Sequence, residues 1–249
     1  MTPPMLLAGL PVPHGFFTRQ GGVSTGPFAS LNCSLSGKDD LAAVAENRRR
    51  AADALGVACL VGLFQVHGAE VAVVESPWGD DDRPRADAAV TRCRGIGLAV
   101  VTADCAPILF VDSEAGVVAA AHAGWRGAIA GVLEATVAAM ERLGAERGRI
   151  VAAIGPCIRQ PSYEVGEDVV EALGAAGAPF LAPALRPDRR LFDLPGHCAA
   201  RLIAAGVAKV FDLGLDTYSD EARFFSHRRA THSGEGPVGH QLSAIALPR

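Results

Sequence analysis

Short apolar runs recur along the chain, and three of them end at a polar residue that can bind a metal or take part in catalysis. These runs cover about 60–66, 96–102 and 117–122. Short apolar runs bounded by turn residues are typical of buried β-strands. The polar residues at their ends are His67, the pair Asp104 and Cys105, and His122. The pattern predicts a site with one thiol and two imidazoles at the edge of a sheet.

Other segments follow the helical period, in which apolar residues recur every three to four positions. Asp39 and Asp40 open the first of these segments, and Gly56 ends it. Residues 174–188 are rich in Pro, Ala and Gly and are predicted to form a surface loop. The predicted helices cover about 40–55, 128–143, 166–173 and 195–205. The other predicted strands cover about 15–19, 71–74, 85–88, 107–111, 149–154, 207–213 and 242–247.

The order of these elements predicts a mixed α/β fold with α+β character. Neither an internal repeat nor a clear linker divides the chain. A chain of 249 residues, of which 49% are hydrophobic, can form one large domain with a well-buried core. We therefore expect a single domain over residues 1–249, with one large sheet or two stacked sheets flanked by helices.

Composition and charge narrow the class of function. The net charge is −4 and no basic block stands out, so nucleic acid is not an expected partner. Neither a secretory signal nor a long apolar run is found, so no membrane association is expected and a cytoplasmic location is predicted. The six cysteines contain no Cys-x-x-Cys pair, which argues against a structural zinc finger. The sequence leaves the oligomeric state open.

Two imidazoles and a thiolate form a donor set that suits zinc. Three protein ligands would leave a fourth position for water or substrate, as in catalytic zinc sites. However, His67 and Cys105 are far apart in the sequence, and so are Cys105 and His122. Two other chemistries therefore stay open: a cysteine hydrolase, in which Cys105 is the nucleophile and a histidine the base, and a copper site. Copper is disfavoured because the chain lacks His-x-His pairs and has only three methionines.

Two segments are candidate anion sites. Arg19 precedes a loop with Gly21 and Gly22, whose backbone N–H groups can approach an anion closely. Arg126 lies in a Gly-Trp-Arg-Gly turn where a helix is predicted to begin, and a helix start favours negative charge. The alternative for the loop after Arg19 is an ordinary turn. The alternative for the second segment is a tight turn in which Arg126 forms a surface ion pair. Trp125 can stack on a planar ligand or pack in the core.

Nine motifs occur in an order that closely resembles the YfiH family of laccase-domain proteins, historically labelled polyphenol oxidases. The resemblance extends from about residue 15 to residue 247. The motifs are 15–24 (Gly-Phe-Phe-Thr-Arg-Gln-Gly-Gly-Val-Ser), 30–32 (Ser-Leu-Asn), 65–68 (Gln-Val-His-Gly), 86–88 (Ala-Asp-Ala), 102–107 (Thr-Ala-Asp-Cys-Ala-Pro), 121–127 (Ala-His-Ala-Gly-Trp-Arg-Gly), 155–158 (Gly-Pro-Cys-Ile), 163–165 (Tyr-Glu-Val) and 224–229 (Phe-Phe-Ser-His-Arg-Arg).

The resemblance implies a zinc-dependent enzyme that phosphorolyses inosine, adenosine and methylthioadenosine, and that also deaminates adenosine. Its implied substrates are a purine nucleoside and phosphate, and its implied fold has layered mixed sheets between helices. Carried over by motif, the zinc ligands and catalytic residues are His67, Cys105 and His122. Asp104 is the nearest carboxyl group for proton transfer, although it could instead fix a loop or orient a ligand. The expected substrate contacts are Arg19, Asn32, Arg126 and Tyr163.

Three other functions are kept as alternatives. The first is a cysteine hydrolase or amidase that acts on peptidoglycan precursors, since bacterial members have been linked to peptidoglycan editing. The second is a non-catalytic, zinc-stabilised binding protein, and the third is a copper-dependent polyphenol oxidase. The chain departs from the family pattern at two places. Asp216–Thr217 stands where Cys-Thr is common, and Gly239–His240 stands where Gly-Arg is common. Both departures are expected to alter substrate contacts rather than the metal ligands.

Overall fold

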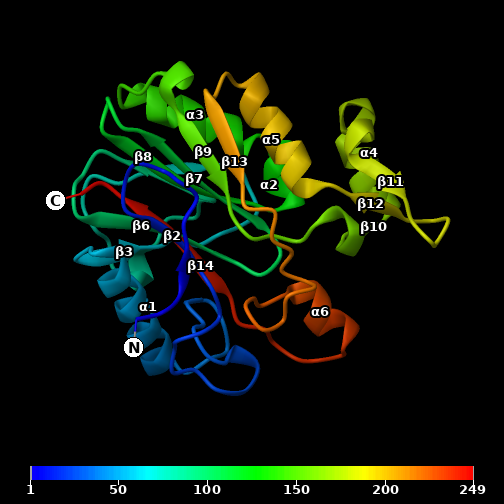
Figure 1. Ribbon diagram of the computed structural model, residues 1–249, viewed down its shortest axis with the longest axis horizontal. Coiled ribbons are helices and arrows are strands. Elements are labelled where there is room, and N and C mark those ends of the chain that lie inside the picture. Colours follow the sequence, from blue (N-terminus) through cyan, green and yellow to red (C-terminus); the bar gives the residue numbers. More distant parts are fainter. Residues whose placement is uncertain (1, 249) are drawn as a thin grey trace.

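Two β-sheets stack on one another in the middle of the molecule (Figure 1). The computed structural model describes residues 2–248. The five-stranded sheet has the order β1 (Met5–Leu6), β2 (His14–Phe17), β14 (Gln241–Ala246), β6 (Ile96–Thr102) and β3 (Cys59–Val61). The six-stranded sheet has the order β13 (Lys209–Asp212), β9 (Val151–Ile154), β7 (Ala106–Asp112), β8 (Val117–Ala123), β5 (Ala88–Thr91) and β4 (Val71–Val73).

Helices cover the outer faces of this pair of sheets. The five-stranded sheet packs on α1 (Leu41–Leu55). The six-stranded sheet is covered by α2 (Trp125–Ala130), α3 (Val132–Arg142) and α5 (Leu194–Ala204). The result is a layered mixed α/β arrangement, as the sequence predicts.

A smaller unit projects from one side of these layers (Figure 1). It consists of α4 (Glu167–Gly177) and a three-stranded sheet in the order β10 (Glu164–Val165), β12 (Arg190–Phe192) and β11 (Leu181–Pro183). The short helix α6 (His227–His232) lies below it in the same view. No helix within residues 2–248 combines the length and the apolar character that crossing a bilayer requires.

Local sequence signals account for most of the elements. Every residue of β7 and β8 is buried, because the two strands lie between the other sheet and the helices. Strands that are covered on both faces have continuous apolar sequences rather than alternating ones. Helix α1 begins at Asp40, whose side chain accepts a hydrogen bond from the Ala42 N–H, and ends at Gly56, where φ is 75°. These caps are the acidic start and glycine stop that the sequence predicts.

Several predicted elements differ from the structure, among them the strand predicted over 85–88, which lies instead at Ala88–Thr91. The single helix predicted over 128–143 is two helices, because Gly131 adopts φ of 96° and breaks the helical path. The strand predicted over about 60–66 ends at Val61. The loop predicted over 174–188 contains the end of α4 and strand β11. Strand β11 forms only by pairing with β12, so no local pattern marks it.

We expect Gly131→Ala to lower the free energy of unfolding by about 1–2 kcal/mol, because a residue with a Cβ pays that cost in the left-handed region. The added methyl group itself meets no close atom, so the cost is conformational. Chemical denaturation of both proteins measures the difference. Gly148→Ala, at a site with open space and ordinary φ, is the matched control and should change stability little. Equal stability of the two variants would contradict this account of the helix break.

Candidate metal centre and its pocket

Three side chains that are distant in sequence converge at the edge of the two sheets. Nitrogen or sulfur atoms of His67, Cys105 and His122 all lie within 4.8 Å of one another. Cys105 lies where the chain passes from β6 in one sheet to β7 in the other, and His122 lies on β8 opposite Pro107 of β7. His67 lies in the loop before β4 and has φ of 59°. This His-Cys-His group could bind a metal ion.

The buried carboxylate of Asp87 holds two of these residues in place. It accepts a hydrogen bond of 2.8 Å from His122 Nδ1, which leaves Nε2 free to bind a metal. It also accepts hydrogen bonds from the backbone N–H groups of Val66, His67 and Gly68, at 3.1, 3.0 and 2.7 Å. Asp87 therefore fixes both the His122 ring and the backbone of the His67 loop.

Gly124 provides the space in which the three side chains meet. A Cβ at this position would lie 2.8 Å from His67 Nδ1 and 3.0 Å from Cys105 Sγ. Real Cβ atoms do not approach other atoms so closely, so any larger residue would displace the group. The first glycine of the Gly-Trp-Arg-Gly turn therefore serves packing around the site.

The electrostatics of the group favour a thiolate beside an imidazolium when no metal is bound. Burial raises the pKa of the Cys105 thiol, but the adjacent His122 and His67 outweigh burial and lower it to about 6. Burial lowers the pKa of His122, but Cys105 and Asp87 raise it to about 9. Burial also opposes ionisation of Asp87, yet the hydrogen bonds from His122 and Gly68 hold its pKa below the usual range. A deprotonated thiol is the form that ligates a metal.

Asp104 anchors two distant segments to the Cys105 loop. Its carboxylate accepts hydrogen bonds from Thr217 Oγ1 at 2.7 Å and from the Arg228 backbone N–H at 2.6 Å. Its backbone has φ of 88°, and its carbonyl accepts from the Ile158 N–H. These contacts match the loop-fixing alternative raised for Asp104, and its role in proton transfer stays a prediction.

The group lies in the wall of a cavity of about 620 Å³, which is within the range of small-molecule sites. Asp104 is the single acidic residue in the lining, whereas three arginines contribute to it. The charged and polar residues that line the cavity are Ser34, Ser36, Gln65, His67, Arg83, Thr102, Asp104, Cys105, His122, Arg126, Tyr163, His227, Arg228 and His240. The cavity is therefore suited to an anionic ligand.

The family described as multi-copper polyphenol oxidoreductase laccase matches residues 13–248. The chain belongs to this family. The purine nucleoside phosphorylase of Deinococcus radiodurans is 45% identical over 251 residues, 99% of this chain and 94% of that protein. The purine nucleoside phosphorylase YfiH of Escherichia coli is 39% identical over 220 residues, 87% of this chain and 88% of that protein.

A solved structure supports the same assignment. The Neisseria meningitidis protein NMB0706 is 34% identical, has a TM-score of 0.88, and covers 98% of this chain and 99% of its own. The comparisons confirm the resemblance to the YfiH proteins and the mixed α/β fold. Two imidazoles and one thiolate form a donor set that either zinc or copper accepts. Within residues 2–248 one group of three or more close metal-binding side chains occurs, so the structure indicates a single candidate metal site.

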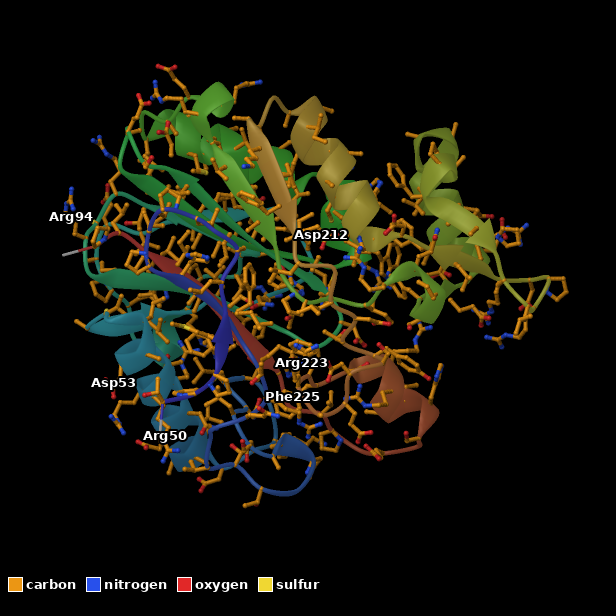
Figure 2. The ribbon with its side chains drawn as sticks, in the orientation of Figure 1. Arg50, Asp53, Arg94, Asp212, Arg223 and Phe225 are labelled. Atoms are coloured by element: carbon orange, nitrogen blue, oxygen red, sulfur yellow. The ribbon has the colours of Figure 1, made fainter. Side chains whose placement is uncertain are left out.

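Two residues predicted to contact substrate lie outside the cavity and make contacts within the protein. The Arg19 guanidinium lies 4.4 Å from the centre of the Phe225 ring, which is labelled in Figure 2, and donates to the Ala29 carbonyl. Asn32 is fully buried, where it donates to Asp39 and accepts from the His240 backbone N–H. Neither side chain lines the cavity. Asn32 was singled out by motif alone, and Arg19 also by the glycine-rich loop that follows it. Neither signal distinguishes a ligand contact from a packing contact.

The other two predicted contacts, Arg126 and Tyr163, do line the cavity. The loop at Gly21 and Gly22 does not line it, and Gly22 packs against the Ser30 backbone so closely that a Cβ would overlap it. The anion site predicted at this loop is therefore not part of the cavity.

Sequence reasoning gave no role to several residues of the site. Three of them lie in motifs of the family: Asp87 in Ala-Asp-Ala, and His227 and Arg228 in Phe-Phe-Ser-His-Arg-Arg. The fourth, His240, lies in the Gly-His pair where the chain departs from the family pattern. The other departure also reaches the site, because Thr217 hydrogen bonds to Asp104. The motifs marked these residues, but only the three-dimensional arrangement assigns their contacts.

In metal-free protein we expect iodoacetamide to alkylate Cys105 with an apparent pKa near 6 instead of 9. Only the thiolate reacts, so the rate should rise through the lower value and then level off. Mass spectrometry of the Cys105 peptide over a pH series measures this rate. His122→Asn should move the midpoint upward, because the charge that stabilises the thiolate is gone. A midpoint in the ordinary thiol range for the unmodified protein would contradict the ion-pair description.

Proposed function

We propose that this protein is a zinc-dependent purine nucleoside phosphorylase that also deaminates adenosine. Inosine, adenosine or methylthioadenosine would react with phosphate to give the free base and the ribose 1-phosphate compound. Near full-length relatives that are named purine nucleoside phosphorylase support this proposal. The observation that carries it in the structure is the His-Cys-His group in a cavity with a cationic lining. We also propose that the enzyme works in the cytoplasm.

The donor set supports zinc as the metal. His67 and His122 offer imidazole nitrogens, and Cys105 offers a thiolate whose formation the site favours. Zinc bound by three protein ligands keeps one position for water or substrate and acts there as a Lewis acid. Asp87 holds the His122 ring in the orientation that ligation requires.

Arg126 and Arg228 are our candidates for the phosphate subsite. Neither guanidinium forms an ion pair with a carboxylate within residues 2–248. Arg126 lies 4.3 Å from the centre of the Trp125 ring, and Arg228 lies 5.4 Å from the centre of the Tyr163 ring. Arg228 Nη1 donates to the Glu164 carbonyl at 2.9 Å. Stacking on an aromatic ring orients each guanidinium and leaves its remaining N–H groups available to phosphate oxygens.

The reaction can be written from these parts. A phosphate oxygen forms a bond to C1′ of the ribose as the bond from C1′ to the purine nitrogen breaks. The electron pair of that bond leaves with the base, which takes up a proton. Arg126 and Arg228 would hold the attacking phosphate next to the ribose and balance its charge, so that the bond forms between two bound reactants.

One observation also favours a cysteine hydrolase. Cys105, His122 and Asp87 form a thiol, imidazole and carboxylate series with a perturbed thiol pKa, which is the arrangement of a cysteine nucleophile. Peptidoglycan precursors would be the substrates of such an enzyme. The metal separates the two functions, since a hydrolase of this type needs no zinc and no His67.

Product analysis with adenosine and with inosine, each with and without phosphate, tests the proposal. We expect phosphate-dependent release of adenine or hypoxanthine, and formation of inosine from adenosine without phosphate. His67→Ala and Cys105→Ala should both lose bound metal and turnover, with metal content measured on the same samples. If zinc-loaded protein turns over neither nucleoside, the proposal is wrong and the hydrolase takes its place.

We expect Arg126→Gln to raise the KM for phosphate by about tenfold or more, because a charged hydrogen bond to phosphate is lost. The KM for inosine should change little, since Arg126 is assigned to the other substrate. Steady-state kinetics with each substrate varied in turn measures both constants. Arg142→Gln, an exposed site at the end of α3, removes the same charge far from the cavity and should leave both unchanged. A rise in the KM for inosine alone would contradict the assignment.

A further inference from the structure

Two polar atoms in the cavity wall are buried without any hydrogen-bond partner. They are Thr102 Oγ1 and His240 Nδ1. Folded proteins satisfy nearly all buried polar groups, and the exceptions in native structures require an explanation. A bound ligand can explain such an atom in a residue that lines a cavity, because the ligand can supply the missing hydrogen-bond partner.

The sheet register places these two residues together. Thr102 is the last residue of β6 and pairs with Gln241, the first residue of β14, so His240 directly precedes the paired position. The His240 backbone N–H donates to Asn32 Oδ1 at 2.9 Å, and Asn32 Nδ2 donates to Asp39. The backbone of His240 is thus held firmly, while its imidazole makes no hydrogen bond within residues 2–248.

The surroundings of this pair differ from those of Arg126 and Arg228. The neighbouring lining residues Leu63 and Val101 are apolar. The Gln65 amide lines the same part, but both of its ends are bonded to the Val101 backbone, at 2.8 and 2.9 Å. The Arg83 guanidinium donates to the carbonyls of Asp80 and Leu63. Thr102 Oγ1 and His240 Nδ1 therefore stand out in this part of the lining as buried polar atoms whose hydrogen-bonding capacity is unused.

We propose that Thr102 and His240 bind the purine base along the edge that carries N7 and the substituent at C6. This inference rests on the proposed phosphorylase function and places the base in the part of the cavity that Thr102 and His240 line. A planar base suits apolar flanks with a few polar atoms, whereas phosphate requires charge. Asn32 then acts as a positioning residue, because it fixes the backbone of His240.

The chemistry of this pair also accounts for a broad choice of base. A purine with a 6-oxo group presents two acceptors along this edge, whereas adenine presents an acceptor and an amino donor. A threonine hydroxyl rotates to donate or accept, and a neutral imidazole does either according to its tautomer. The same two side chains can therefore match inosine and adenosine without any movement of the backbone.

Thr102→Val and His240→Leu test the proposal, with binding measured by calorimetry and turnover measured by steady-state kinetics. We expect each variant to weaken binding of inosine about three- to tenfold, the usual effect of one lost hydrogen bond. The KM for phosphate and the bound metal should be unchanged. Thr102→Ser and His240→Gln, which restore polar atoms, should recover part of the affinity. Thr102→Val removes an unmet buried hydroxyl and should not lower the melting temperature.

Three results would overturn the proposal. Unchanged inosine affinity in both variants would show that the pair does not touch the base. A higher KM for phosphate with an unchanged KM for inosine would assign His240 to the anion subsite. Loss of metal in Thr102→Val or His240→Leu would give the pair a structural role at the metal group. Because calorimetry detects inosine without turnover, an unmodified protein that binds inosine but does not cleave it refutes the phosphorylase and leaves the base subsite standing.

Discussion

The site depends on one buried carboxylate. Asp87 is fully buried, and it accepts four hydrogen bonds that connect the His67 loop with the His122 ring. A buried carboxylate is stable only where hydrogen bonds or charges compensate for lost water, and here the compensating groups are those that must be positioned. If Asp87 were neutral or absent, the His67 backbone would lose its acceptors and the His122 ring its orientation. The positions of His67 and His122, two of the three candidate metal ligands, therefore both depend on the folding of the segment that leads into β5.

The third ligand depends on how the two sheets are connected. Cys105 lies in the short link by which the chain leaves the five-stranded sheet at β6 and enters the six-stranded sheet at β7. That link is tight enough to force a positive φ at Asp104, and Thr217 and Arg228 hold the Asp104 carboxylate in this turn. The sheet stack, the turn and the two C-terminal segments therefore determine the position of the thiol together.

The sequence predicts what local patterns determine and misses what distant contacts determine. Helix α1 has its acidic start, its periodic core face and its glycine stop in one stretch, so its bounds are predictable. Cys105 and His122 lie at or near the ends of apolar strands, as the sequence pattern indicates, so their convergence is predictable. His67 lies well beyond the end of β3 at Val61, and its loop brings it to the other two. By contrast, Asn32 and Arg19 have the residue types of ligand contacts, and only the packing of Phe225 and His240 against them reveals their structural roles. The role of Asp87 was missed for a similar reason, because three of its partners are backbone groups and the fourth, the His122 ring, is distant in sequence.

The arginines in the cavity lining differ in how their buried charge is stabilised. A guanidinium can remain in the cavity wall without a carboxylate only if something else stabilises it, and aromatic rings do so while leaving its N–H groups free. Arg83 gives two of its five N–H donors to the carbonyls of Asp80 and Leu63. Arg228 gives one donor to the Glu164 carbonyl and Arg126 gives none within residues 2–248, so these two guanidinium groups keep more donors for phosphate. A reaction between a charged and an uncharged substrate is served by this difference, because phosphate then has a preferred place in the cavity.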